Sequence, residues 1–372
     1  MTWRFLRNVL LKGSVLFLAC DLLFAAWHPA GLGKVSAYNH LFPGRLRFPF
    51  GENPTQAYNL SLFDLDAMFA SHVIAAAPKP ADEYRVILIG DSSVWGTLLK
   101  PEETLAGLLN AASITACDGR QIRVYNLGYP TISLTKDLMI LTEAMRYQPD
   151  LVVWPLTLEA FPTDKQLSSP LVSHNSGRVR DLIRAYNLPF DVNDPALWTP
   201  SFWDKTIIGQ RRDLADLARL QLYGVLWAAT GVDQVYPADY PRAQIDFAAD
   251  DVSFHDQQPP SLDEAKLAFA VIAAGVRLAG ETPVLIVNEP MLVSTGKNSD
   301  VRYNFFYPRW AYDHYRQMMS EQSQRSGWSY LDLWDVLPES EFTNSAIHMT
   351  PAGEAIFAAQ LAGVIQERTC SK

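Results

Sequence analysis

A serine and a histidine at predicted sheet edges are the residues of this chain that could carry out nucleophilic chemistry. Ser92 follows the apolar run at residues 86–89 through Gly90-Asp91, and such a run is typical of a strand buried on both faces. Ligands bind at the carboxyl ends of strands in open α/β sheets, so Ser92 is a candidate nucleophile. Ser92 could instead cap the helix that follows, because serine is a preferred N-cap residue.

A serine nucleophile needs a base, and His348 is the candidate. Seryl oxygen is a poor nucleophile near neutral pH, so an imidazole must take its proton and later return it to the leaving group. Of the seven histidines, His348 is the one at a predicted strand-to-helix edge, just before the helix start Thr350-Pro351. A lone histidine is more often a packing or surface residue, so the interpretation of His348 depends on Ser92.

The sheet that must position both residues is predicted from alternating segments. Strand-like runs lie at residues 86–89, 121–127, 151–154, 283–287 and 328–333. Helical patterns lie at 104–112, 134–146, 262–278 and 352–367, and a further one follows the loop at 304–310 and runs through 319 and 322. This alternation favours a parallel sheet of about five strands with helices on both faces. Residues 161–260 interrupt it with polar, tryptophan-rich loops and an amphipathic helix around 212–229. We interpret this insertion as a lid and not as a separate domain, because no linker-like stretch bounds it.

Three short motifs follow one another along the chain. Gly90-Asp91-Ser92-Ser93 follows the first strand, Asn126-Leu127-Gly128 ends the second, and His348-Met349-Thr350-Pro351-Ala352-Gly353 opens the last helix. In order and spacing they resemble the SGNH/GDSL hydrolase superfamily, which comprises esterase- and acetyltransferase-type enzymes, over residues 84–368 without the insertion. The resemblance implies a flavodoxin-like three-layer αβα sandwich. It also implies that Ser92 is the nucleophile, His348 the base, and the backbone N–H groups of Ser92 and Gly128 oxyanion donors.

The third motif of that family departs from the usual pattern here. It ends in an asparagine that gives a further oxyanion donor, and Thr157 stands at the corresponding place after the third strand. A hydroxyl can donate one hydrogen bond, but loss of a well-placed donor costs about 2.7 to 4 kcal/mol of transition-state stabilisation. Asn288, at the end of the fourth strand, could complete the oxyanion hole or could be a turn residue before Pro290.

The residue that orients His348 also departs from the family pattern. The family usually has an aspartate three residues before the histidine, where this chain has Ser345, with Asn344 one position earlier. The Asn344 amide oxygen could orient the imidazole, although a neutral amide cannot stabilise an imidazolium as a carboxylate does. Asp332 or Asp335, near the end of the last strand, could supply that charge. A backbone carbonyl could also suffice in a Ser-His dyad.

The loop at residues 298–309 is a candidate substrate contact. It carries Asn304, Tyr307 and Arg309 among aromatic side chains. A carbohydrate or a polar acyl acceptor could stack and hydrogen-bond there. The alternative is a structured loop held by ordinary packing and cation–π contacts.

The amino-terminal segment predicts a membrane anchor. Residues 9–27 are mostly apolar and would span about 28 Å as a helix, close to the thickness of a hydrocarbon core. Arg4, Arg7 and Lys12 lie at its start, so the positive-inside rule places the N-terminus in the cytoplasm and the main domain outside. Asp21 is the residue least suited to a bilayer, since it would cost about 2.5 to 3.5 kcal/mol near the centre.

We therefore expect residues 1–28 to be an uncleaved anchor, 29–82 a connecting and covering segment, and 83–372 the main domain. Three alternatives remain for the first segment: a cleaved signal peptide, a lipid attachment at Cys20, and a buried helix of a soluble protein.

Composition excludes some classes of function. The net charge of −9 argues against sequence-independent nucleic-acid binding, which needs a surplus of Lys and Arg. Cys20, Cys117 and Cys370 show neither CxxC nor histidine-rich spacing, so we predict no metal and no cofactor. If the main domain lies outside the cytoplasm, Cys117 and Cys370 could form a disulfide; otherwise they are two unrelated thiols.

The sequence thus predicts an extracytoplasmic serine esterase or acyl transferase that acts through Ser92 and His348. Its expected substrate is an acyl ester, such as an acetyl ester, of a carbohydrate or a cell-envelope polymer, and hydrolysis is favoured over transfer. The alternative is a catalytically weakened relative that binds a glycan or assists envelope assembly. This alternative draws on Thr157 and Ser345, which stand where the family has its asparagine and aspartate.

Overall fold

The computed structural model of the chain describes residues 2–27, 44–48, 50, 65–230 and 239–370. Within these residues, one sheet has five parallel strands: β1 (Glu83–Leu88), β2 (Gln121–Asn126), β3 (Leu151–Leu156), β4 (Val284–Asn288) and β5 (Ser329–Asp332). The strand order β2-β1-β3-β4-β5 is that of flavodoxin-like doubly wound sheets. The predicted sheet is therefore confirmed.

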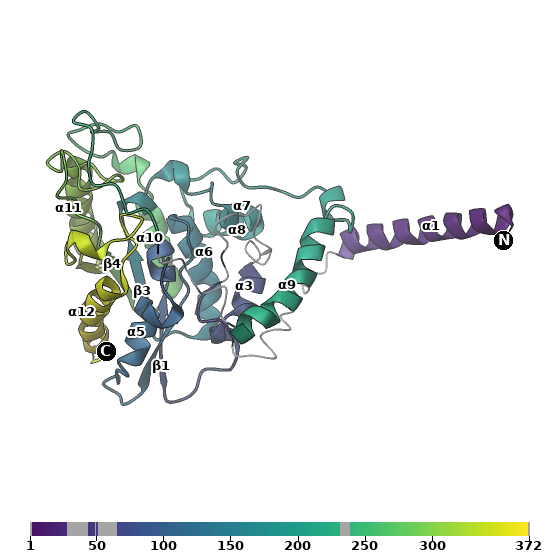
Figure 1. The fold of residues 1–372 in the computed structure, drawn as a ribbon, viewed down its shortest axis with the longest axis horizontal. Helices are drawn as coiled ribbons and strands as arrows, with labels where there is room; N and C mark the ends of the chain where they lie inside the picture. The colour runs from purple at the N-terminus through teal and green to yellow at the C-terminus, as the bar shows by residue number, and fades with distance from the viewer. Residues whose placement is uncertain (1, 28–43, 49, 51–64, 231–238, 371–372) are drawn as a thin grey trace.

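Helices cover both faces of this sheet (Figure 1). One face carries α5 (Leu105–Ala111) and α12 (Pro351–Cys370), and the other carries α6 (Leu134–Ala144), α10 (Phe269–Ala279) and α11 (Arg309–Ser326). Val86 and Leu88 of β1 pack in the layer of α5 and α12, whereas Ile87 packs in the layer of α6 and α10. Because β1 is buried on both faces, its core residues form a continuous apolar run. The fold is the expected three-layer αβα sandwich.

The insertion between β3 and β4 contributes to the main core. The α-helices among its described residues are α7 (Pro170–His174), α8 (Ser176–Tyr186) and α9 (Arg211–Thr230). The first two pack against α6, and Val179 and Ile183 of α8 are buried in the same hydrophobic core as that helix. Its interpretation as a lid and the predicted segment boundaries stay predictions.

The predicted helix at residues 262–278 is wrong in its first turns. The α-helix begins at Phe269, after a 3-10 turn, η9 (Glu264–Lys266). The Ala268 N–H donates to the carbonyl of Phe161 at 2.8 Å instead of to a helical carbonyl. This backbone hydrogen bond to the segment that follows β3 thus takes precedence over the helical pattern of residues 262–268.

Two residues of the predicted connecting segment, Arg47 and Phe48, contact the turn that follows β1. Residues 28–43, 49 and 51–64 lie outside the described residues; the remainder includes α3 (Leu65–Ser71) and the 3-10 turn η2 (Val73–Ala75). The Arg47 guanidinium lies over the Trp95 ring, 4.1 Å from its centroid, and donates to the Gly96 carbonyl at 2.8 Å. Phe48 is fully buried beside it. These contacts hold the short helix α4 (Ser92–Trp95) from outside.

Helix α1 (Trp3–Trp27) projects from the body of the molecule (Figure 1). Within the described part of the chain, it is the one helix long and apolar enough to cross a membrane. Asp21 is 2% exposed and lies at the junction with the insertion, where its Oδ1 accepts from the Ile208 N–H at 3.1 Å. The residue least suited to a bilayer therefore has a hydrogen-bond partner at the end of α1 that meets the body.

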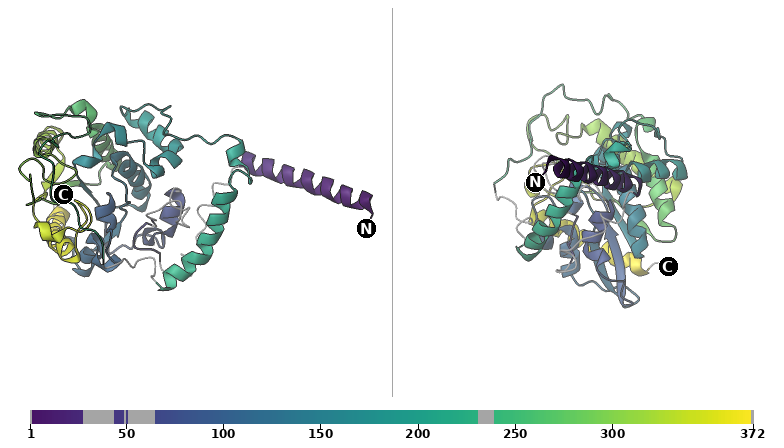
Figure 2. Two further views of the ribbon diagram at one scale, coloured as in Figure 1. Left: turned by 45° about the horizontal axis from the view of Figure 1, so that its top comes forward. Right: turned by 90° about the vertical axis from the view of Figure 1, so that its right-hand side faces the viewer.

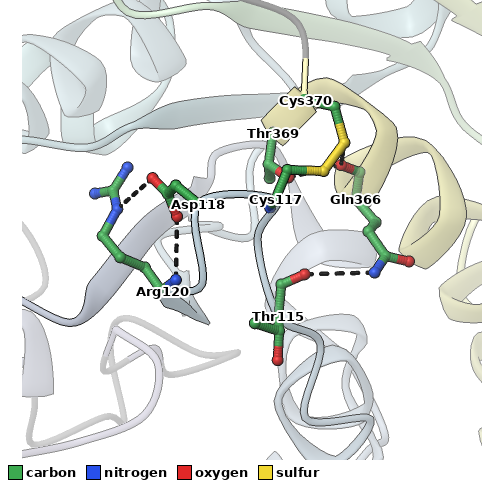
Figure 3. Close-up of a disulfide and its surroundings, with 7 residues drawn as sticks. All are labelled: Thr115, Cys117, Asp118, Arg120, Gln366, Thr369 and Cys370. Atoms are coloured by element: carbon green, nitrogen blue, oxygen red, sulfur yellow. Dashed lines mark hydrogen bonds and ion pairs between the residues drawn. A yellow bond between two sulfur atoms is a disulfide. The ribbon is translucent and has the colours of Figure 1, made fainter.

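A disulfide joins Cys117 to Cys370, with a Cα–Cα distance of 5.2 Å (Figure 3). It connects the last turn of α12 to the loop before β2. The Cys117 N–H also donates to Thr369 Oγ1 at 2.9 Å. Of the two alternatives for these cysteines, the structure has the disulfide, while Cys20 is free and exposed.

Candidate active site

Ser92 is the first residue of α4, directly after the turn that ends β1. Asp91 caps this helix, because its Oδ1 accepts from the Ser93 N–H at 2.8 Å. Gly90 has a φ of 157°, and a Cβ there would lie 2.6 Å from Val94 Cγ2 and 3.0 Å from the Pro155 carbonyl. Only glycine allows so close an approach. Since Asp91 is the cap, the Ser92 hydroxyl is available for other chemistry.

His348 lies against Ser92 although 256 residues separate them. Its Nε2 is 2.7 Å from Ser92 Oγ, and its Nδ1 is 2.8 Å from Asn344 Oδ1. An amide oxygen only accepts hydrogen bonds, so the contact with Asn344 keeps the proton on Nδ1 and leaves Nε2 to accept from Ser92. The structure thus brings the side chains of Ser92, His348 and Asn344 together in a continuous chain of hydrogen bonds.

Burial lowers the pKa of His348 to about 4. The imidazole is therefore neutral at pH 7, as a general base must be. Asn344 is exposed and carries no charge to oppose the effect of burial. The base is correctly oriented, but its protonated form has no carboxylate to stabilise it.

Asn288 and Asp332 lie elsewhere. These two residues are neighbours in the β4–β5 register, and the Asn288 amide donates to Asp332 Oδ1 at 2.8 Å. Asp332 Oδ2 accepts from Arg316 at 2.9 Å, and Asn288 Oδ1 accepts from the Tyr312 hydroxyl at 3.0 Å. The structure therefore corrects two predictions: Asn288 is not an oxyanion donor and Asp332 does not orient His348, because both side chains bind the α11 layer. Asp335 is exposed, and within the described residues the ring nitrogens of His348 bind Asn344 and Ser92 and not Asp335.

The candidate oxyanion donors differ in availability. The Ser92 N–H belongs to the first turn of α4, where no intrahelical acceptor exists. The Gly128 N–H donates to Asn126 Oδ1 at 3.0 Å, and a Cβ on Gly128 would lie 2.6 Å from the Trp95 nitrogen. Thr157 is fully buried and donates its hydroxyl to Tyr307 at 3.0 Å. Ser92 thus offers an open donor, Gly128 must share its donor, and the Thr157 donor is occupied.

The predicted substrate contacts in the loop at 298–309 are structural. Asn304 is fully buried, and its side chain accepts from the Tyr307 N–H at 3.1 Å and donates to the Leu292 carbonyl at 2.9 Å. Tyr307 is also fully buried. Arg309 lies over the Tyr303 ring, 4.2 Å from its centroid. The alternative of a loop held by packing and cation–π contacts is what the structure has, and the predictions for Asn304, Tyr307 and Arg309 are corrected accordingly.

A cavity of about 450 Å³ opens at the serine and histidine. It is lined by Ser92, Ser345, His348, Pro130, Thr131, Ile132, Lys165, Ser168, Ser169, Pro170 and Phe306. Hydroxyl groups, one cation and apolar side chains thus surround the nucleophile. The insertion supplies one wall, residues 165–170, which no periodic pattern in the sequence could connect to Ser92.

Lys165 is held in this wall by a buried carboxylate. Its ammonium pairs with Glu159, whose carboxylate also contacts His255 Nε2 at 3.1 Å. Burial acts to raise the pKa of Glu159, but its bonds with His255 and Lys165 lower it below the ordinary value. The same bond with Glu159 raises the pKa of His255. A fixed cation therefore faces the cavity beside Ser92.

A buried polar network supports the turn that presents Ser92. Lys136 Nζ donates to the Gly90 carbonyl at 2.5 Å and to the Tyr129 carbonyl at 3.0 Å. Ser93, the neighbour of Ser92, donates its hydroxyl to Glu289. Burial, followed by repulsion from Asp91, raises the pKa of the Glu289 carboxyl group well above its ordinary value. In the described residues, no cluster of His, Cys, Asp and Glu suited to a metal ion occurs.

No family model matches the chain, and no curated protein matches it. Solved structures similar to it include a carbohydrate acetylesterase family member from Sinorhizobium meliloti, at 12% identity and a TM-score of 0.33 over 77% of this chain and 98% of that one. An aryl esterase from M. smegmatis is similar at 15% identity and a TM-score of 0.33, over 76% and 98% of the two chains. An acetylxylan esterase from Geobacillus stearothermophilus is similar at 15% identity and a TM-score of 0.35, over 76% and 93%. At these low scores, the fold assignment rests on this chain's own strand order.

Proposed function

We propose that the chain is an SGNH-type serine esterase that cleaves an acyl ester, such as an acetyl ester, of a carbohydrate or cell-envelope polymer. The observation that carries the proposal is the chain of contacts from Ser92 Oγ to His348 Nε2 at 2.7 Å and from His348 Nδ1 to Asn344 at 2.8 Å. A serine hydroxyl bound to a neutral imidazole, which is bound in turn to an orienting acceptor, is the arrangement that acyl transfer requires.

The chemistry follows from these three groups. Ser92 Oγ attacks the ester carbonyl while His348 Nε2 takes its proton, and the Ser92 N–H donates to the oxyanion that forms. When this tetrahedral intermediate collapses, the bond between the carbonyl carbon and the alcohol oxygen breaks. The alcohol takes the proton from His348 and departs, and the acyl group stays on Ser92 as an ester. Water, activated by His348 in the same way, then releases the acid. A sugar hydroxyl in place of that water would make the reaction an acyl transfer.

The lining of the cavity supports a polar alcohol portion of the substrate. Thr131, Ser168 and Ser169 can exchange hydrogen bonds with hydroxyl groups, and Phe306 offers an apolar surface for a sugar ring. Lys165 adds a charged donor.

We further propose that α1 anchors the protein in a membrane and that its main domain lies outside the cytoplasm. The cationic residues Arg4, Arg7 and Lys12 at the start of α1 favour this orientation. The disulfide between Cys117 and Cys370 supports it independently, because disulfides persist in oxidising compartments and are rare in the cytosol.

A second candidate function is that of a catalytically weakened protein that binds glycan or assists envelope assembly. The occupied hydroxyl of Thr157 and the shared N–H of Gly128 favour it, since both reduce the set of oxyanion donors. Turnover of a chromogenic acetyl ester by the full chain in detergent distinguishes the two. The esterase proposal predicts turnover that Ser92→Ala abolishes and that Ser320→Ala, an exposed position on α11 outside the cavity lining, retains. Glycan binding without turnover, unchanged in Ser92→Ala and His348→Ala, would favour the second candidate.

A further inference from the structure

Exposed large apolar side chains outside α1 concentrate in one segment, residues 198–226 of the insertion. Seven of them, each between 42% and 73% exposed, are Trp198, Phe202, Trp203, Ile208, Leu222, Tyr223 and Leu226. In the rest of the described chain outside α1, Leu46 and Ile356 are the large hydrophobic residues with comparable exposure. We call residues 198–226 the α9 face. A concentration of this kind marks a surface that another apolar phase covers.

The α9 face adjoins the candidate membrane span. The 3-10 turn η7 (Trp203–Lys205) contacts α1, and the Ile208 N–H donates to Asp21 of α1. Ala25, one turn further along α1, is 4% exposed. Helix α9 leaves this junction and runs across the direction of α1 on the side of the body from which α1 projects (Figures 1 and 2). If α1 crosses a membrane, α9 lies along its surface.

Helix α9 has apolar residues on two sides. The side toward the body includes Gly224, which is buried, and Leu217, which is partly buried. The opposite side carries an exposed stripe at helical spacing: Ala215, Ala218, Leu222, Leu226 and Ala229. A helix that separates a protein core from water would carry polar residues there. This pattern fits a helix that lies between the protein and a lipid phase.

The charged and aromatic residues of this face fit the same surroundings. Trp198 and Trp203 are exposed, and tryptophan is enriched at the boundary between acyl chains and headgroups. Lys205 ends η7, and Arg211 and Arg212 begin α9, so three cationic side chains flank the short connection where their charges would meet lipid phosphates.

We propose that the α9 face docks into the headgroup–acyl boundary of the bilayer that α1 spans. This inference rests on the proposed anchoring by α1 and goes beyond the proposed esterase activity. The insertion also supplies cavity residues 165–170, so its docking fixes the orientation of the site relative to the membrane. The partner is the surface of an anionic phospholipid bilayer.

The proposal is tested on the full chain in nanodiscs of phosphatidylcholine and phosphatidylglycerol. In a Cys20→Ser background that keeps the Cys117–Cys370 disulfide, Leu222→Cys and Leu226→Cys are labelled with an environment-sensitive fluorophore. Lipids with a spin label near the headgroup or deep in the acyl chain serve as quenchers. Ile356→Cys on α12, 40% exposed and far from α1, is the matched surface control, and Leu16→Cys reports on α1 itself.

Docking predicts that the labels at 222 and 226 lose fluorescence with headgroup-region quenchers, while the label at 356 keeps it. Ala218→Cys, on the same stripe, repeats the measurement if a label at 222 perturbs the helix. If deep lipid quenchers reach the label at 16 but the labels at 222 and 226 keep as much fluorescence as the label at 356, the docking proposal is overturned and the anchoring proposal stands. An unquenched label at 16 would instead overturn anchoring. A blue-shifted but lipid-inaccessible label at 222 would identify a protein partner, such as a second copy, and would also overturn the proposal.

Discussion

The substitution Asn344→Asp tests how the base works. Asn344 Oδ1 lies 2.8 Å from His348 Nδ1, so an aspartate of nearly the same shape would place a carboxylate against the imidazole without moving it. The wild-type residue orients His348 but leaves the imidazolium that forms in the transition state without a counter-charge. The substitution therefore adds charge to an existing geometry.

The expected gain is modest because Asn344 is exposed. Two unit charges about 4 Å apart interact by about 1 kcal/mol in water. This energy corresponds to roughly a fivefold rise in kcat/KM and a rise of about 0.7 in the pKa of His348. Since burial holds that pKa at about 4 in the wild type, the acid limb of the kcat/KM profile should move toward higher pH.

The assay is the pH dependence of kcat/KM for a chromogenic acetyl ester. Asn344→Ala, which removes the acceptor, should lower kcat/KM, and Ser345→Asp, which adds a carboxylate to the adjacent residue of the cavity lining, serves as the charge control. If Asn344→Asp and Asn344→Ala both match the wild type in rate and in the position of the acid limb, the assignment of Asn344 as the orienter is refuted.

Three further predictions concern Glu354, Thr157 and the disulfide. Burial raises the pKa of Glu354 to about 8. Between the ordinary value of 4.5 and pH 8, the folded state therefore keeps a proton that the unfolded state releases, and the free energy of unfolding falls by ~1.4 kcal/mol for each unit that the pH rises. Glu354→Gln should therefore raise Tm more at pH 8 than at pH 4 in calorimetry, and an equal effect at both would contradict this sign. Thr157→Val should lower the free energy of unfolding by about 1 kcal/mol, through the lost bond to Tyr307, while kcat/KM persists; a fall of about a hundredfold or more would make Thr157 an oxyanion donor. Replacing Cys117 and Cys370 together by serine should cost about 2 to 5 kcal/mol in denaturant unfolding, and an unchanged midpoint would show that the bond contributes no stability.

Local patterns in the sequence were enough to predict the sheet and to single out Ser92 and His348, which the structure places in contact. The run at residues 86–89 is continuous because β1 is buried on both faces, and the parallel order brings the ends of its strands to one edge. Ser92 and His348 each stand next to a recognisable turn or helix start. Their meeting therefore follows from topology.

The surroundings of the site could not be predicted in this way. By its place at the end of a strand, Asn288 could be an oxyanion donor or a turn residue, but the β4–β5 register places it beside Asp332, and its amide oxygen accepts from Tyr312 of α11. Asn304 carries the hydrogen-bonding groups of a ligand contact but uses them to close its own loop. Lys165 reaches the cavity through a buried pair with Glu159, and nothing in the local sequence marks that contact. The hydrogen-bond partners of these polar side chains can be identified only from the tertiary structure.

Mapping the site of covalent labelling tests the central claim most directly. A fluorophosphonate reacts with a serine that a neighbouring base activates, and mass spectrometry identifies the modified peptide. The contact of Ser92 with His348 predicts a single adduct on Ser92, formed far more slowly in His348→Ala, with none on Ser93, whose hydroxyl is bound to Glu289. An adduct on another residue, or labelling of Ser92 at an equal rate without His348, would contradict the account.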